Sequence, residues 1–298
     1  MSIGVCVITH AAKKHLPKCL TPLLASYLKP KVLVVNSSSH DGTVELAQKM
    51  GADTLVIPRK EFNHGMTREV ARRAIGTEIV VMITPDAYLI DNFQLEMLIA
   101  PLLQGKASAC YAKQLPHKGA GFFEAFAREY NYPDKSHTRG IEDKKKWGAY
   151  TYFCSNSCSA WLNWALDEVG GFPHVLLGED TIACAKLLAH GHKIAYQADA
   201  KVYHSHSYSL KQEFQRHFDT GLARGAMQEL PEENDMGRGK DFAKALLLKT
   251  LREKPLLVPY ALCHLAAKLT GYKMGRASQK APVWLKKTLS SQDFYWTD

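Results

Sequence analysis

The strongest constraint on the fold is the alternation of short apolar runs with helical patterns along the first third of the sequence. The apolar runs are rich in β-branched residues and are typical of strands buried on both faces; they are Ile3–Thr9, Lys31–Val35, Thr54–Ile57 and Glu78–Ile83. The helical patterns between them cover residues 14–27, 43–50 and 67–74. Strands that alternate with helices predict an α/β fold with a mostly parallel, doubly wound sheet and helices on both faces.

In such a sheet, ligands bind outside the carboxyl ends of the strands. The polar residues that follow each apolar run are therefore the first candidates for a binding site, and Thr9, the loop Asn36–Asp41 and Asp86 occupy these positions. The G-x-G-x-x-G and Walker A patterns do not occur in the sequence, so a dinucleotide-binding or P-loop protein has no support.

Composition places the chain among folded globular proteins, because 46% of its 298 residues are hydrophobic and 22% are charged. The seven cysteines are odd in number and lack Cys-x-x-Cys spacing, which favours neither a disulfide framework nor a structural zinc site. A reducing compartment fits this cysteine usage. The first ten residues lack the pattern of a secretory signal, and we expect a cytoplasmic protein.

The positive charge is concentrated at one end of the chain. Residues 238–298 contain twelve Lys and Arg residues against four acidic residues, so about +8 of the formal net charge of +9 lies there. The first 237 residues are therefore nearly neutral. A basic segment of this kind indicates a local electrostatic function that is separate from the main domain.

We expect a first domain over residues 1–228 and a basic helical appendage over residues 229–298, with the acidic stretch Glu229–Asp235 at the boundary. The longest apolar stretch of the tail, Leu256–Ala267, is too short to span a membrane. Amphipathic pieces rich in Lys and Leu favour a peripheral position on an anionic surface, at the inner face of the cytoplasmic membrane. The alternative is a helix packed on the domain with a solvated basic face.

A metal site is one interpretation of the polar residues that follow the strands. Asp86 comes shortly after a buried strand, and Mg²⁺ prefers one or two protein oxygens together with substrate phosphates. His204 and His206 follow another predicted strand at i, i+2 spacing, so we expect their side chains to diverge and, if the strand continues, only one to face the site. The alternatives are a turn or helix-capping aspartate and a loop histidine bonded to the backbone.

Glu179 and Asp180 form a carboxylate pair after a glycine and before a predicted helix. An ionised carboxylate at this position could deprotonate a substrate hydroxyl, and a helix N-terminus favours the ionised form. The alternative is that both acids only cap the helix. Arg68 lies at the start of another helix and could present its planar guanidinium to a phosphate, with a solvated surface position as the alternative.

In this order, these motifs resemble glycosyltransferase family 2, with the GT-A nucleotide-sugar-binding fold, and within it the rhamnosyltransferase-like group. The resemblance extends from Ile3 to about Gly221. The segments that carry it are VVNSSSHDGT (34–43), EFNHGMTRE (61–69), ITPDA (83–87), KQLPH (113–117), FFEAFAREYNYP (122–133), FCSNSCSA (153–160), GGFP (170–173), GED (178–180) and YHSHSYSL (203–210).

The resemblance implies a division of roles among the candidate residues. The nucleotide-sugar-binding residues would be Thr9, Asn36, Ser38, Asp41, His64, Arg68, Thr84, Asp86 and Gln114. Asp86 would be the metal-binding acid of a D-x-D-like motif in which Thr84 replaces the first acid, with His204 as a further metal or diphosphate contact and Mg²⁺ or Mn²⁺ as the cofactor. Asp180, beside Glu179, would be the catalytic base that deprotonates the acceptor hydroxyl.

Three positions depart from the family pattern, because Asn36, Pro85 and Glu69 stand where Asp, Gln and Asn are usual. Asn36 can still hydrogen-bond a pyrimidine base, but it has no charge. These departures bear on the identity of the donor more than on the type of reaction.

The resemblance therefore predicts an inverting, metal-dependent glycosyltransferase that moves rhamnose from dTDP-rhamnose to a glycan or lipid-linked glycan acceptor in surface polysaccharide synthesis. One alternative is transfer from a UDP- or GDP-sugar. A nucleotidyltransferase would be expected to carry a Gly-rich loop after the first strand, where the sequence has Thr9-His10-Ala11-Ala12-Lys13. A non-catalytic, basic nucleic-acid-binding protein would explain the tail but would leave the acidic residues without a role, and no nucleic-acid partner is expected.

Overall fold

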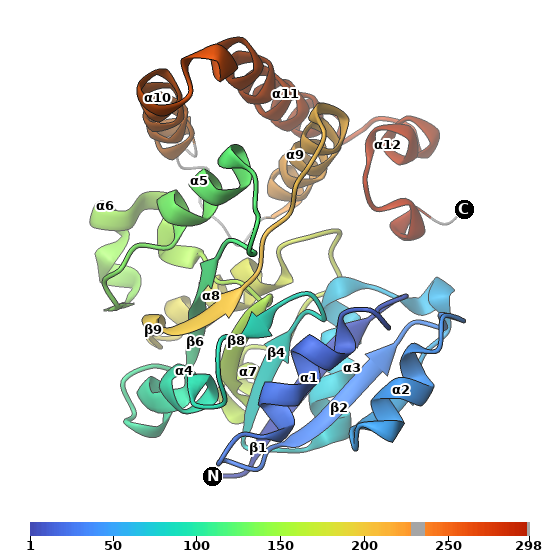
Figure 1. The fold of residues 1–298 in the computed structure, drawn as a ribbon. Coiled ribbons are helices and arrows are strands. Elements are labelled where there is room, and N and C mark those ends of the chain that lie inside the picture. Colours follow the sequence, from blue (N-terminus) through green and yellow to red (C-terminus); the bar gives the residue numbers. More distant parts are fainter. Residues whose placement is uncertain (228–235, 297–298) are drawn as a thin grey trace.

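The computed structural model describes residues 1–227 and 236–296 of the chain, and Figure 1 shows their arrangement. The strands are β1 (Ile3–Thr9), β2 (Lys31–Asn36), β3 (Asp53–Val56), β4 (Ile79–Ile83), β5 (Tyr88–Leu89), β6 (Ala109–Leu115), β7 (His137–Arg139), β8 (Cys158–Leu162) and β9 (Ile194–Tyr203). The helices are α1 (Leu16–Leu24), α2 (Thr43–Lys49), α3 (His64–Ile75), α4 (Gln94–Leu103), α5 (Phe122–Asn131), α6 (Lys144–Trp147), α7 (Asn163–Glu168), α8 (Glu179–Ala189), α9 (Leu210–Ala226), α10 (Met236–Glu253), α11 (Val258–Ala277) and α12 (Val283–Leu289).

The strands form one sheet in the order β3-β2-β1-β4-β8-β6-β9-β5, with β7 paired to β9. The expected parallel arrangement holds for β3-β2-β1-β4 and for β6 with β9. Strand β8 runs antiparallel to both β4 and β6, so the sheet as a whole is mixed. Every side chain of β4 is buried, as expected for a strand covered by helices on both faces.

The segment 114–152 contains helix α5 and several short elements. Helix α3 begins at His64, three residues before its expected start at Thr67, because Asn63 caps it. The side chain of Asn63 accepts hydrogen bonds from the backbone nitrogens of Gly65 and Met66, both at 3.0 Å. This cap places His64 and Arg68 on the first turns of α3.

The basic tail is helical, as predicted, and α11 packs directly on α9 (Figure 1). Glycines allow the two helices to come close: a Cβ atom added at Gly271 would lie 2.3 Å from the backbone oxygen of Phe214, and one at Gly275 would lie 2.1 Å from that of Phe218. Pro259 lies in the first turn of α11, as expected from its place in the sequence. The predicted boundary at 229–235 lies outside the described residues.

We expect Gly275→Ala to destabilise the chain, because the added methyl group must push α11 away from α9. Overpacking of this kind lowers the free energy of unfolding by about 1–3 kcal/mol. Gly239→Ala in α10 is the matched control, since nothing lies within 4 Å of a Cβ atom at that position and an alanine favours a helix. Thermal unfolding of both variants measures the effect. Equal stability of Gly275→Ala and the unchanged chain would contradict the close packing of α11 on α9.

Candidate active site

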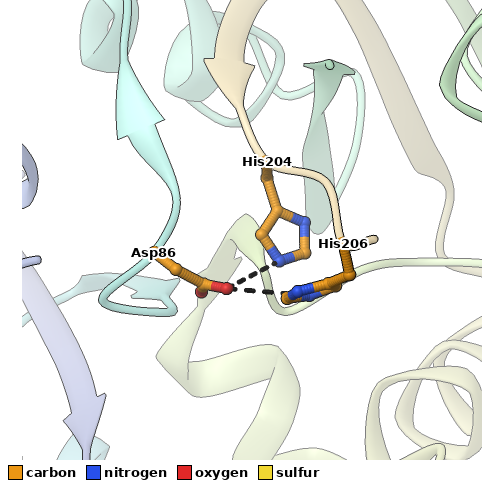
Figure 2. Close-up of side chains that lie close together, drawn as sticks. All are labelled: Asp86, His204 and His206. Carbon is orange, nitrogen blue, oxygen red and sulfur yellow. Dashed lines mark ion pairs between the residues drawn. The ribbon is translucent and has the colours of Figure 1, made fainter. Parts of the chain in front are cut away.

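Asp86, His204 and His206 meet beyond the ends of two strands (Figure 2). Asp86 lies in the turn after β4, and the two histidines follow the end of β9 at Tyr203. One oxygen of Asp86, Oδ2, lies 3.6 Å from Nε2 of His204 and 3.6 Å from Nε2 of His206. One ligand atom from each of the three residues lies within 4.8 Å of the others. The three side chains therefore present one oxygen and two nitrogens to a common point.

The expectation that only one of the two histidines faces the site was wrong. Residues two apart in a strand lie on the same face, so the i, i+2 spacing does not separate the two side chains, and β9 in any case ends at Tyr203, before either histidine. The backbone beyond the strand brings both imidazole rings to Asp86, with their ring centroids 4.7 Å apart and nearly perpendicular. His206, to which the family resemblance gave no role, is therefore a candidate site residue as well.

Gln114 fixes the orientation of His204. Its Oε1 lies 2.9 Å from Nδ1 of His204, and its amide nitrogen donates to the hydroxyl of Ser155 at 2.9 Å. Because an amide oxygen can only accept, Nδ1 of His204 carries the proton and Nε2 carries the lone pair. That lone pair is on the nitrogen nearer Asp86, so Gln114 plays the part of the outer hydrogen-bond partner that metal-binding histidines usually have.

The electrostatics of the three residues suit a cation. Burial lowers the pKa of His204 to about 3, so its imidazole is neutral at physiological pH. Burial also lowers the pKa of His206. For Asp86, burial opposes ionisation, but the two histidines and the hydrogen bonds outweigh it and hold its pKa below the ordinary value. An ionised carboxylate with two neutral imidazoles is a donor set that fits a divalent metal ion.

A second charged centre lies at the N-terminus of α8. Asp180 is held by two backbone nitrogens, that of Asn156 at 3.1 Å and that of Thr181 at 2.7 Å. Burial, and after it the negative charge of Glu179, raises the pKa of Asp180 to about 7. Asp180 therefore changes protonation state near neutral pH, which suits a group that takes up a proton during a reaction.

The carboxylate of Glu179 is paired with Arg68 and hydrogen-bonded to Asn156. Its Oε1 lies 3.1 Å from Nη1 of Arg68 and accepts a hydrogen bond from the amide of Asn156 at 3.0 Å. Burial opposes its ionisation, but Arg68 and the neighbouring His64 and Asn156 hold its pKa below the ordinary value. Arg68 is itself buried, which argues against the solvated surface position weighed as an alternative. Of the carboxylate pair, Asp180 is the better candidate for a base.

The predicted nucleotide-binding residues at the ends of β1 and β2 bond to one another and to the backbone. Asn36 donates to the hydroxyl of Thr9 at 3.1 Å and accepts from the backbone nitrogen of Ser39 at 2.8 Å. The hydroxyl of Ser38 donates to the backbone oxygen of Ile57 at 2.7 Å, and Asp41 accepts from the backbone nitrogen of Lys13 at 3.0 Å. These contacts shape the loop that follows β2.

A cavity of about 1450 Å³ joins the two charged centres. Of the predicted site residues, those that line it are His64, Arg68, Thr84, Asp86, Gln114, Glu179, Asp180 and His204. Thr9, Asn36, Ser38 and Asp41 are not among its lining residues, which do include the neighbouring His10 and Ala11. The tail forms part of the opposite wall through α10 and α11, where Phe242, Tyr260 and Lys268 line the same cavity. Residues of the basic tail therefore line the same cavity as the candidate catalytic residues.

Comparisons with known proteins agree on one family. A family model described as "Glycosyltransferase like family 2" matches residues 2–220. The O-antigen chain rhamnosyltransferase RfbN of Salmonella typhimurium is 34% identical over 304 residues, which cover 100% of this chain and 97% of the relative. The O-antigen chain rhamnosyltransferase WbaN of Salmonella anatum is 34% identical over 272 residues, which cover 90% and 86%.

Solved structures share the fold at lower identity. The mannosyltransferase PcManGT from Pyrobaculum calidifontis, in complex with GDP-Man and Mn²⁺, has a TM-score of 0.58 and 17% identity, with 94% of this chain and 75% of that chain covered. TarS of S. aureus, in complex with UDP-GlcNAc, has a TM-score of 0.57 and 15% identity, with 94% and 92% covered. At these identities the likeness concerns the fold alone.

Proposed function

The chain belongs to the glycosyltransferase-like family 2, and from this membership we propose that it transfers rhamnose from dTDP-rhamnose to a growing polysaccharide. The observation that carries the proposal is the 34% identity, over nearly the full length of both chains, to an O-antigen chain rhamnosyltransferase. The family membership favours this catalytic interpretation over a non-catalytic nucleic-acid-binding protein.

Asp86, His204 and His206 would hold the divalent cation. A cation held there would offset the charge that develops on the nucleoside diphosphate as the glycosidic bond breaks. The two imidazole ligands favour Mn²⁺ over Mg²⁺, because Mg²⁺ prefers an all-oxygen environment. Gln114 supports this role, since it holds His204 in the tautomer that presents a lone pair from Nε2.

Asp180 would be the base that takes the proton from the acceptor hydroxyl as the oxygen attacks the sugar carbon. Attack from the face opposite to the leaving group gives inversion in a single displacement. Glu179 would remain ionised in its pair with Arg68 and would keep the neighbouring Asp180 basic. Arg68 keeps one donor for the substrate, because its buried Nε has no hydrogen-bond partner among the residues that the structure describes.

A panel of nucleotide sugars tests the donor assignment. The chain, with Mn²⁺ present, is mixed with dTDP-rhamnose, UDP-sugars and GDP-sugars, and thermal stabilisation and donor consumption are measured. We expect dTDP-rhamnose to give the largest upward shift in melting temperature and the fastest consumption. A preference for a UDP- or GDP-sugar would show that dTDP-rhamnose is not the donor. If no nucleotide sugar has any effect, the proposed function is contradicted.

For the acceptor, we propose a glycan carried on a lipid, reached at an anionic membrane surface. The supporting feature is the tip between α10 and α11, where Leu251 is 62% and Leu256 is 93% exposed. Arg252 and Lys254, which are also exposed, lie next to these leucines. Exposed leucines among basic residues suit an interfacial contact with anionic lipid. No helix among the described residues is long and apolar enough to cross a membrane.

Replacing both tip leucines is expected to weaken binding to vesicles that contain anionic lipid. Each buried leucine contributes about 1.5–3 kcal/mol, so the variant with Leu251→Ser and Leu256→Ser should bind at least about tenfold more weakly in a sedimentation assay at low salt. Leu103→Ser is the control, because Leu103 on α4 is 51% exposed but lies outside the tip. Equal binding of the double variant and the unchanged chain would contradict the membrane contact.

A further inference from the structure

The last described residues of the chain return to the catalytic domain. We call Ser290–Trp296 the C-terminal strap. It is anchored on α9, where both the backbone nitrogen and the hydroxyl of Ser291 donate to Oδ2 of Asp219, at 2.8 Å and 2.6 Å. The side chain of Gln215, also on α9, donates to the backbone oxygen of Ser290 at 3.2 Å. These bonds fix where the strap begins.

From α9 the strap reaches the segment that leads into α3. The ring of Phe294 packs edge-on against Phe62, with centroids 5.0 Å apart, and lies 4.6 Å from the guanidinium carbon of Arg59. Beside it, Oε1 of Gln292 lies 3.1 Å from Nε2 of His64. On the other side, Tyr295 packs against His174, with centroids 5.8 Å apart, in the loop before α8. The strap thus contacts both segments that supply the Arg68–Glu179 pair.

His64 connects the strap to the active site. Its backbone oxygen accepts a hydrogen bond from Arg68 at 2.9 Å, and the same nitrogen of Arg68 pairs with Glu179, the neighbour of Asp180. The residue also lines the cavity. Because the amide oxygen of Gln292 can only accept, His64 must donate from Nε2, which leaves Nδ1 as an acceptor. Gln292 therefore selects one tautomer of a histidine that lines the cavity.

We propose that the C-terminal strap positions the donor side of the active site, with Gln292 as the positioning residue that acts through His64 on Arg68. The packing of Phe294 on Phe62 holds the strap in place for this contact. The strap reaches the active site through Gln292 on His64 and Phe294 on Phe62, so its effect on the reaction passes through the ordered start of α3. This inference rests on the proposed glycosyl transfer.

The test compares three glutamine variants of the full-length chain. Gln292→Leu removes the acceptor for His64, whereas Gln292→Glu keeps an acceptor oxygen at the end of a side chain of the same length. Gln279→Leu is the matched control, because Gln279 also joins the tail to α9, through a 2.8 Å hydrogen bond to the backbone oxygen of Leu222, but does not bond to His64. Melting temperature, kcat and donor KM are measured for each.

A second measurement does not depend on turnover. The ring-nitrogen chemical shifts of His64 in the ligand-free chain, identified by comparison with a His64→Asn variant, report which nitrogen carries the proton. We expect the Nε2–H tautomer in the unchanged chain and in Gln279→Leu, and a mixture in Gln292→Leu. A mixture already present in the unchanged chain would overturn the inference.

We expect Gln292→Leu to reduce kcat/KM for the donor by about tenfold to a hundredfold, as small misplacements at an active site do, with a loss of melting temperature no greater than that of Gln279→Leu. Gln292→Glu should recover most of the activity. Equal activity of Gln292→Leu and Gln279→Leu would show that the strap has only a structural role and does not position the active site. If the unchanged chain consumes no nucleotide sugar, the proposed function fails. The tautomer of His64 can still be measured in that case, and it tests the role of the strap separately.

Discussion

Replacing Asp180 with Asn is expected to reduce sugar transfer by about 10²–10⁴-fold, the usual contribution of general base catalysis, while nucleotide binding stays nearly unchanged. The amide keeps the size of the carboxylate but cannot accept the proton of the acceptor hydroxyl. Stopped or continuous measurement of sugar transfer, together with calorimetry of nucleotide binding, gives both quantities. Loss of nucleotide binding together with activity would show instead that Asp180 serves to cap α8.

Because the pKa of Asp180 is raised, Asp180→Asn should also differ from the unchanged chain in how its stability depends on pH. Since the pKa rises from 3.8 to about 7 on folding, the folded chain holds a proton over this range that the unfolded chain releases. Stability therefore falls as the pH rises from about 4 to 7, and the loss is complete above 7. Asp180→Asn should remove this loss and melt at a higher temperature than the unchanged chain at pH 8, with the gap closing toward pH 4. The exposed Asp199, changed to Asn, is the control.

The same pKa predicts the pH dependence of the reaction. Only the ionised form of Asp180 can take a proton, so kcat/KM for the unchanged chain should rise with pH up to about 7 and then level off. A rate that is independent of pH between 5 and 8 would contradict the assignment of Asp180 as the base.

Replacing Asp86 with Ala is expected to abolish the metal-dependent part of nucleotide-sugar binding. The carboxylate is the only charged member of the Asp86, His204 and His206 group, so its loss should cost more than the 10–100-fold that removal of an outer hydrogen-bond partner costs at metal sites. Binding of dTDP-rhamnose is measured with Mn²⁺, with Mg²⁺ and with a chelator. The unchanged chain should bind most tightly with Mn²⁺.

Two histidine variants sharpen this test. His206→Ala should lower the affinity for Mn²⁺ as strongly as His204→Ala, because both nitrogens lie 3.6 Å from the same oxygen of Asp86. His190→Ala, on the exposed end of α8, is the control. An Asp86→Ala variant that binds nucleotide equally well with and without metal, as tightly as the unchanged chain, would rule out the metal site.

The sequence allowed the fold to be predicted from local pattern, and the same pattern supplied candidate site residues. Asp86 and His204 were identified as polar residues that follow buried strands, and the carboxyl ends of strands in such a sheet meet at one edge. His206 was assigned to the wrong side, because the i, i+2 spacing was taken to separate the two histidines, although residues two apart in a strand share a face and β9 ends before both. The antiparallel insertion of β8 between β4 and β6 likewise left no signature in its five residues.

Contacts between segments that lie far apart in the chain could not be predicted from the sequence. The pairing of Arg68 with Glu179 joins the start of α3 to the start of α8, and the bond between His64 and Gln292 joins α3 to the end of the chain. No spacing or periodicity encodes such pairs. The basic charge of the tail indicated an appendage. The sequence did not show that glycines of α11 allow close packing on α9, because this depends on which helix faces them in the fold.

The most direct test of the whole account is the configuration of the bond that the chain makes. Rhamnose is transferred from dTDP-rhamnose to a lipid-linked glycan acceptor in the presence of Mn²⁺, and nuclear magnetic resonance determines the anomeric configuration of the product. Single displacement with Asp180 as the base predicts a product opposite in configuration to the donor, formed about 10²–10⁴-fold more slowly by Asp180→Asn. A product that retains the donor configuration, or that forms equally well with Asp180→Asn, would contradict the account.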